Sequence, residues 1–170
     1  MFTAESYQQS QSSAPEAFTE EDILELGDTV ASASANLFNE MLPRIVERVV
    51  GAGQEAEEAL ASGGFVLNDC TVVLRLNPDT DSVEFFCDVG LPHYHGQEAV
   101  YRKAMEMNLC RTYPGIVFGI HPESGRLVAT TATHALLMSD DEVCVNTLQM
   151  LTRVVAQLRL SHTFELDESA

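Results

Sequence analysis

The chain has 170 residues, and 45% of them are hydrophobic, which is enough to build the core of one globular domain. Twenty-six acidic residues stand against nine basic ones, so the formal net charge is −17. This charge repels phosphate backbones and anionic headgroups, and we therefore expect no nucleic-acid partner and no membrane insertion. A basic or amphipathic polypeptide remains an acceptable partner, although acidity also serves simple solubility.

The N-terminal part of the chain is expected to be a polar tail followed by helices. Residues 1–18 are rich in Ser, Gln and Glu, a composition that does not offset chain entropy, so a flexible tail is predicted. Residues 19–62 are predicted to be helical, because an acidic first turn is followed by apolar residues at helical spacing. Pro43 interrupts this pattern, and the sequence leaves open whether it kinks one helix or begins another. A short acidic helix is expected at 54–60.

Residues 63–160 form the predicted core, in which strand and helix patterns alternate. The order helix, three strands, helix, two strands, helix favours a two-layer α+β domain, with an antiparallel twisted sheet packed with helices. The turn sequence HPESG at 121–125 joins the last two strands, and Ser139 opens the last helix in a capping box, SDDE. An acidic tail is predicted at 161–170. The strands are expected at 65–67, 71–76, 83–89, 116–120 and 127–133, and the later helices at 97–110 and 139–160.

The cysteines and the chain start bear on the compartment. Cys70, Cys87, Cys110 and Cys144 include no C-x-x-C pair, and we interpret them as buried thiols in a reducing environment. The N-terminus lacks a cationic start and an apolar core, and no stretch approaches the ~18 apolar residues of a membrane span. We therefore expect a cytoplasmic protein.

No motif in the sequence indicates catalysis. There is no G-x-S-x-G, no P-loop and no dinucleotide-binding glycine fingerprint. His93 and His95 have metal-ligand character, but zinc sites need three or four ligands, and Asp88 and Glu98 stand in no recognised spacing. We expect no enzymatic activity, no cofactor and no metal, and we interpret the two histidines as solvent-exposed.

Alternation along the strands predicts an apolar face for the core and a second, mixed face. In the last two strands the core list is Ile116, Phe118, Ile120, Leu127 and Ala129. The opposite list is polar apart from four residues, which are Val73, Phe86, Val117 and Val128. With helices on one side only, these four form an exposed contact surface for a partner, unless loops or the N-terminal segment cover them.

The helix at 97–110 has a wider apolar face than one sheet contact needs. At 100° per residue the apolar positions cover about 160° of its circumference. They are Val100, Tyr101, Ala104, Met105 and Met107, with Asn108 inside the arc. The surplus suggests a two-fold dimer contact, unless Met and Tyr simply border the core.

Residues 65–158 resemble the class I type III secretion chaperones, the family that includes the Tir chaperone. The resemblance rests on the strand pair around Leu74 and 85–89, on the helix that ends in MNLC, and above all on the hairpin FGIHPESGRLV. This hairpin looks like the family's G-x-x-P-x-[ST]-G-x-[LV] stretch. The shared order α-β-β-β-α-β-β-α carries as much weight as any residue, whereas the residues before about 38 extend beyond a typical member.

The resemblance implies an acidic, cytosolic homodimer that uses no nucleotide. Such a protein binds the N-terminal region of secreted effectors, keeps it extended and secretion-competent, and prevents aggregation. The family's middle helix lies at the dimer interface, which assigns Tyr101, Met105 and Leu109 there, and the four apolar residues of the mixed face become the effector-binding candidates. The alternative is a chaperone-like regulatory or interaction domain without a secreted client.

Overall fold

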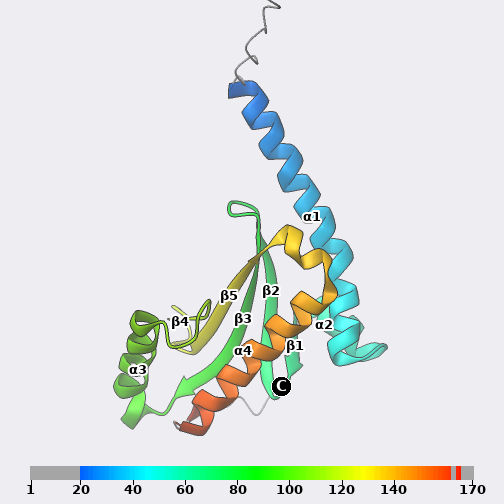
Figure 1. Ribbon diagram of the computed structural model, residues 1–170. Helices are drawn as coiled ribbons and strands as arrows, with labels where there is room; N and C mark the ends of the chain where they lie inside the picture. The colour runs from blue at the N-terminus through cyan, green and yellow to red at the C-terminus, as the bar shows by residue number, and fades with distance from the viewer. Residues whose placement is uncertain (1–19, 162–163, 166–170) are drawn as a thin grey trace, which may run out of the picture.

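A computed structural model describes residues 20–161 and 164–165. They form an α+β domain whose antiparallel sheet carries helices on one face (Figure 1). The tail predicted at 1–18 lies outside the described residues, as does most of the acidic tail predicted at 161–170. In chain order the elements are α1 Glu20–Val50, α2 Gln54–Ser62, β1 Gly64–Leu67, β2 Cys70–Asn77, β3 Ser82–Pro92, η1 Tyr94–Gly96, α3 Gln97–Cys110, β4 Val117–Ile120, β5 Leu127–His134, η2 Ala135–Ser139, α4 Asp141–Ser161 and β6 Phe164–Glu165.

The sheet has the strand order β1-β2-β3-β5-β4, and every neighbouring pair is antiparallel. Asn68 and Asp69 form the two-residue turn between β1 and β2, with φ values of 52° and 59°. Two positive φ angles match the type I′ turn, which suits the twist of a tight hairpin. The register between β3 and β5 shifts between Asp88 and Gly90, a bulge that bends β3. The predicted fold class is thus confirmed.

The core lies between the sheet and the helices α1, α2 and α4. In Figure 1, α4 crosses in front of β2 and β3. The buried side chains of α4 include Cys144, Leu148, Leu151 and Val155. Both the sheet and the helices contribute fully buried side chains to the core, among them Met41 of α1, Phe85 of β3 and Leu148 of α4. Among the described residues, no helix is both long enough and apolar enough to cross a membrane.

Two local expectations for the helices have clear outcomes. Pro43 lies inside α1, which is one helix of 31 residues. The capping box expected from Ser139 is wrong, because residues 135–139 form the short helix η2 and α4 begins later. Asp140 is the cap instead, since its Oδ1 accepts the main-chain N–H of Glu142 at 2.9 Å, while Ser139 Oγ donates to the carbonyl of Leu136.

Two side chains expected in the interior are on the surface. Ile120 is 45% exposed, although its pairing partner Leu127 is fully buried. Ile120 ends an edge strand next to a turn, where no other element of the described residues covers it. Cys110 is also exposed, whereas the other three cysteines are buried, and burial raises the pKa of Cys144 to about 12.

Candidate functional site

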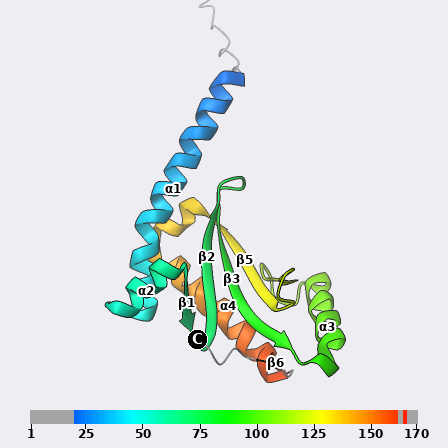
Figure 2. The ribbon, with the colours of Figure 1, turned by 180° about the vertical axis from the view of Figure 1, so that it is seen from behind.

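The face of the sheet opposite α4 is open in the part of the chain that the structure describes. Figure 2, seen from behind, shows β2, β3 and β5 in front with no helix over them. Val73 pairs with Phe86, Phe86 with Thr130, and Thr130 with Val117. Since directly paired residues share a face, this row crosses four strands on the same side. Val128 lies one row further along, and we call this surface the open face.

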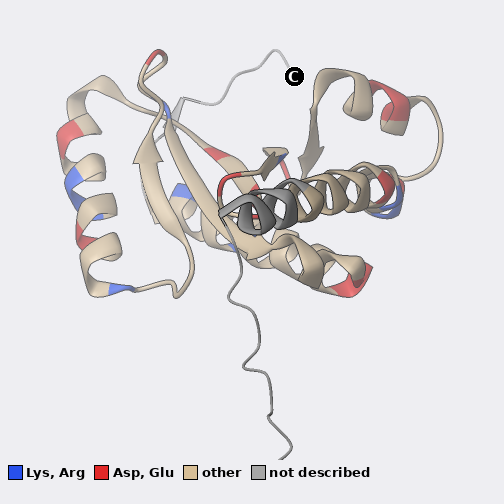
Figure 3. Ribbon diagram, turned by 90° about the horizontal axis from the view of Figure 1, so that it is seen from above, with Lys and Arg blue, Asp and Glu red and all other residues tan. Residues whose placement is uncertain are grey.

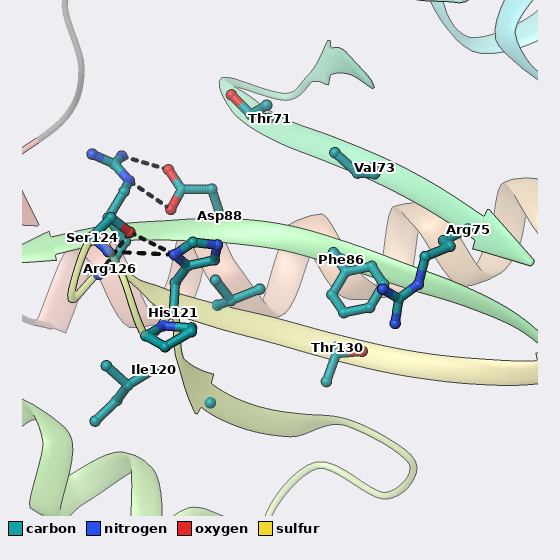
Figure 4. Close-up of a pocket in the computed structure, with 13 residues that line it drawn as sticks. Thr71, Val73, Arg75, Phe86, Asp88, Ile120, His121, Ser124, Arg126 and Thr130 are labelled. Atoms are coloured by element: carbon teal, nitrogen blue, oxygen red, sulfur yellow. Dashed lines mark hydrogen bonds and ion pairs between the residues drawn. The ribbon is translucent and has the colours of Figure 1, made fainter. Parts of the chain in front are cut away.

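A hollow of about 750 Å³ lies over the open face. Figure 4 shows the side chains of Val73, Phe86 and Thr130 directed into it from three strands, with the hairpin turn after β4 as one wall. Three of the four residues predicted from the sequence, which are Val73, Phe86 and Val128, line this groove. The fourth, Val117, is exposed on the same face beside it. The apolar side chains that line the groove are Val73, Phe86, Ile120, Pro122 and Val128.

Two ion pairs hold the polar side chains of the open face. Arg126 donates from Nε to Asp88 Oδ1 at 3.0 Å, and its Nη2 bonds the other carboxylate oxygen (Figure 4). Arg75 donates from Nε and Nη2 to Glu84 Oε2 at 3.1 and 2.7 Å, and its guanidinium lies 5.1 Å from the ring centroid of Phe86. The contact of Arg126 is bidentate, whereas both nitrogens of Arg75 share one carboxylate oxygen and its guanidinium also contacts the Phe86 ring. The open face thus presents apolar side chains and no net charge from these four groups.

Asn108 of α3 occupies the free edge of the sheet at β4. Its Nδ2 donates to the carbonyl of Phe118 at 2.8 Å, and its Oδ1 accepts the N–H of Phe118 at 2.9 Å. A strand added at this edge would need the same two groups, so Asn108 protects the edge from pairing. This role was not predicted from the sequence. The signal that could have indicated it is the position of an amide side chain, Asn108, inside the apolar arc of the helix at 97–110.

The residues assigned to the dimer interface divide into two groups. Tyr101 is half-buried, accepts a hydrogen bond from Gln97 and donates from its hydroxyl to the carbonyl of Gly125, so its polar end is held by the hairpin turn. Met105 and Leu109 are exposed on α3. Leu109 is 86% exposed and Met105 is 47% exposed, so these two side chains are more open to a partner than Tyr101.

The possible metal ligands are also placed. His93 and His95 lie in the connection before α3, where both are exposed, and their ring centroids are 5.8 Å apart. Within residues 20–161 and 164–165, no group of three His, Cys, Asp or Glu side chains is arranged to hold a metal ion.

An antiparallel sheet with one helix-covered face and one open apolar face is suited to contact with another polypeptide. No protein-family model and no curated protein matches the sequence. The fold is shared with a chain in the structure of the HopA1-SchA chaperone-effector complex, with a TM-score of 0.54 and 16% identity over 74% of this chain and 95% of that chain. It is also shared with a chain in the crystal structure of the ExsC-ExsE complex, with a TM-score of 0.51 and 17% identity over 65% and 92%. At these identities the likeness establishes the fold.

Proposed function

We propose that the protein is a class I type III secretion chaperone of the cytoplasm. It binds the N-terminal chaperone-binding region of one or more secreted effectors, keeps that region extended and secretion-competent, and prevents its aggregation. The observation that carries the proposal is the open face, on which Val73, Phe86, Val117 and Val128 lie together. The fold likeness to a chain of a chaperone-effector complex supports the same function. The function needs no cofactor and no catalytic residue.

The test is to purify the tagged protein from its host and to compare secreted proteins with and without its gene. We expect a secreted protein to co-purify through its N-terminal region and to be depleted when the gene is deleted. The double variant Val73→Thr/Val128→Thr keeps strand-forming, β-branched side chains but places hydroxyls on the open face, so it should weaken co-purification. Leu136→Gln changes an exposed apolar residue on the helix side and is the matched control.

One outcome would replace this function with the alternative. If gene deletion leaves every secreted protein at its normal level, while a protein that is not secreted co-purifies through the open face, the chain is a chaperone-like interaction domain without a secreted client.

The chaperone is proposed to act as a homodimer through α3, with Met105 and Leu109 in the contact and the ring of Tyr101 beside them. Leu109 is 86% exposed, so a charge introduced there has little effect on the monomer but is costly inside an apolar interface. Leu109→Lys should convert a dimer to a monomer in sedimentation velocity. Leu160→Lys is the matched control, because Leu160 is 89% exposed on α4 and should leave the dimer intact. A wild-type protein that is monomeric at micromolar concentration contradicts the dimer.

A further inference from the structure

Three glycines lie in the described strands, and two of them have a reason within the chain. Gly90 has a φ of 120° at the bulge of β3, a conformation that residues with a side chain rarely adopt. Gly64 of β1 is crowded, because a Cβ there would lie 3.1 Å from the carbonyl oxygen of Val72 and 3.2 Å from Cγ2 of Val73. Gly119 of β4 has neither reason.

Gly119 weakens its own strand. Its φ is not positive, and a Cβ built on it would meet no atom within 4 Å beyond its immediate chain neighbours. A glycine inside a strand loses more backbone entropy on folding than a β-branched residue and contributes no side chain to the sheet. Such a glycine often marks the place where a ligand or another chain approaches the strand closely. The space over Gly119 is therefore a candidate binding position.

Gly119 lies at the β4 end of the open face. It pairs with Val128, and both residues line the groove. Val117 lies two residues earlier on the same face of β4, and the turn at 120–122 follows directly. We call the space over Gly119, between Val117, Val128 and this turn, the Gly119 subsite. The missing side chain leaves a hollow in an apolar part of the groove, which a side chain of a partner can fill.

The polar side chains of the groove near this turn are already engaged. His121 Nδ1 accepts the main-chain N–H of Ser124 at 3.4 Å and bonds the hydroxyl of the same residue at 3.1 Å. Asp88 is held by Arg126 (Figure 4). A polar occupant would lose its water without gaining one of these groups, whereas an apolar side chain gains by leaving water. The Gly119 subsite therefore favours an apolar occupant.

The partner has to approach over the face, because the edge of β4 is occupied. Asn108 holds both the N–H and the carbonyl of Phe118, so a strand does not pair with β4 there. The neighbouring helix α3 adds no net charge, since its two basic and two acidic residues form ion pairs along the helix. Figure 3 shows these basic residues beside the acidic ones. Selection at the Gly119 subsite thus rests on shape and apolar surface.

We propose that the Gly119 subsite receives one large apolar side chain, such as leucine, isoleucine or phenylalanine, from the polypeptide segment that binds the open face. The proposal rests on the client-binding function proposed for that face, and it adds a requirement at one position of the client. Gly119 is then a specificity residue, because any side chain at this position of β4 occupies the space that the client's side chain needs.

The first test fills the subsite. Gly119→Val should raise the Tm by about 2–4 °C, because valine suits a strand and its Cβ meets no other part of the chain. The same variant should retain about tenfold less of the secreted client in co-purification, since the client can no longer bury one large apolar side chain. Gly119→Ala should lie between the two. Thr71→Val is the matched control, because it places the same side chain on the open face at β2 and leaves the subsite empty.

The second test needs no client. The full-length protein with ¹³C-labelled Ile, Leu and Val methyl groups is titrated with N-acetyl-leucinamide and, separately, with N-acetyl-serinamide at millimolar concentrations. The leucine compound should shift the methyl signals of Val128 and Ile120, and the serine compound should not. Val66 on β1, at the opposite edge of the sheet, is the internal reference and should stay unchanged. In Gly119→Val the shift at Ile120 should be lost, and in Thr71→Val it should remain.

The two tests separate failure of the subsite from failure of the proposed function. Equal co-purification of a client with the wild type and Gly119→Val overturns the subsite and leaves the function standing. If no client co-purifies with the wild type, the function fails and the titration alone decides the subsite. Shifts of Val66 as large as those of Val128 would mean unselective apolar contact, and a lower Tm of Gly119→Val would mean that the fold requires the glycine. A change of oligomeric state in Gly119→Val, measured by sedimentation velocity, would mean that a second copy fills the hollow, and each of these three results overturns the proposal.

Discussion

Replacement of Asn108 by alanine should lower the free energy of unfolding by about 2.5 kcal/mol. The side chain makes two hydrogen bonds with the main chain of Phe118, at 2.8 and 2.9 Å, and each contributes ~1 kcal/mol net. Phe118 is buried, so its freed N–H and C=O recover little water, which adds roughly 1 kcal/mol. Alanine regains about 0.5 kcal/mol through its higher helix propensity in α3.

Urea denaturation followed by circular dichroism measures this change, and thermal unfolding should show a Tm lower by ~5–10 °C. Asn146→Ala is the control, because Asn146 is an exposed asparagine inside α4, in its second turn, and gains the same helix propensity. Asn108→Asp keeps an acceptor for the N–H of Phe118 but sets a carboxylate against its carbonyl, so it should be as damaging as alanine. If Asn108→Ala and Asn146→Ala unfold at the same urea concentration, Asn108 does not hold the edge of β4.

Three other measurements test the interior and the polar contacts. Ellman's reagent should react rapidly with one thiol of the native protein, Cys110, and a second fast thiol would contradict the burial of the others. Arg159→Leu should cost about 3 kcal/mol in urea denaturation, because the guanidinium donates to three main-chain oxygens of β3 and the β1–β2 turn, and an unchanged midpoint would refute this anchoring. Hydrogen bonds from Asn77 and Arg75 lower the pKa of Glu84 from its ordinary 4.5. The ionised Glu84 carboxylate therefore stabilises the fold fully above pH 4.5, and this stabilisation is lost as the pH falls through the lowered pKa of Glu84 in the folded protein. The loss of stability caused by Glu84→Gln should for this reason be smaller at pH 3 than at pH 7.

The parts of the fold that follow from local periodicity are predictable from the sequence. Side chains alternate along a strand whatever the sheet packs against, so the shared face of Val73, Phe86, Val117 and Val128 follows from spacing alone. The helix at 97–110 is likewise bounded by local signals, because Tyr113-Pro114-Gly115 prevents its continuation. These features need no knowledge of which elements meet.

The features that sequence reasoning missed depend on contacts between distant elements. Alternation gives the direction of Ile120 but not the absence of a cover at the end of an edge strand. Asn108 acts only because α3 lies along β4, and the pairing of Asp88 with Arg126 requires the register between β3 and β5. Asp140 replaces Ser139 as the helix cap because the hydroxyl of Ser139 is bonded to the carbonyl of Leu136 within η2. In each case the deciding partner is set by tertiary packing.

The net charge of −17 does not reveal where the protein binds. On the open face, Arg75 and Arg126 are paired with Glu84 and Asp88, so this surface is locally balanced although the chain as a whole is strongly acidic. Solubility and long-range attraction then come from the rest of the surface, while the open face contributes apolar contact between ion pairs that are already formed. A polypeptide that docks there need not break a charge pair or bury an unpaired charge, which keeps the desolvation cost of binding low.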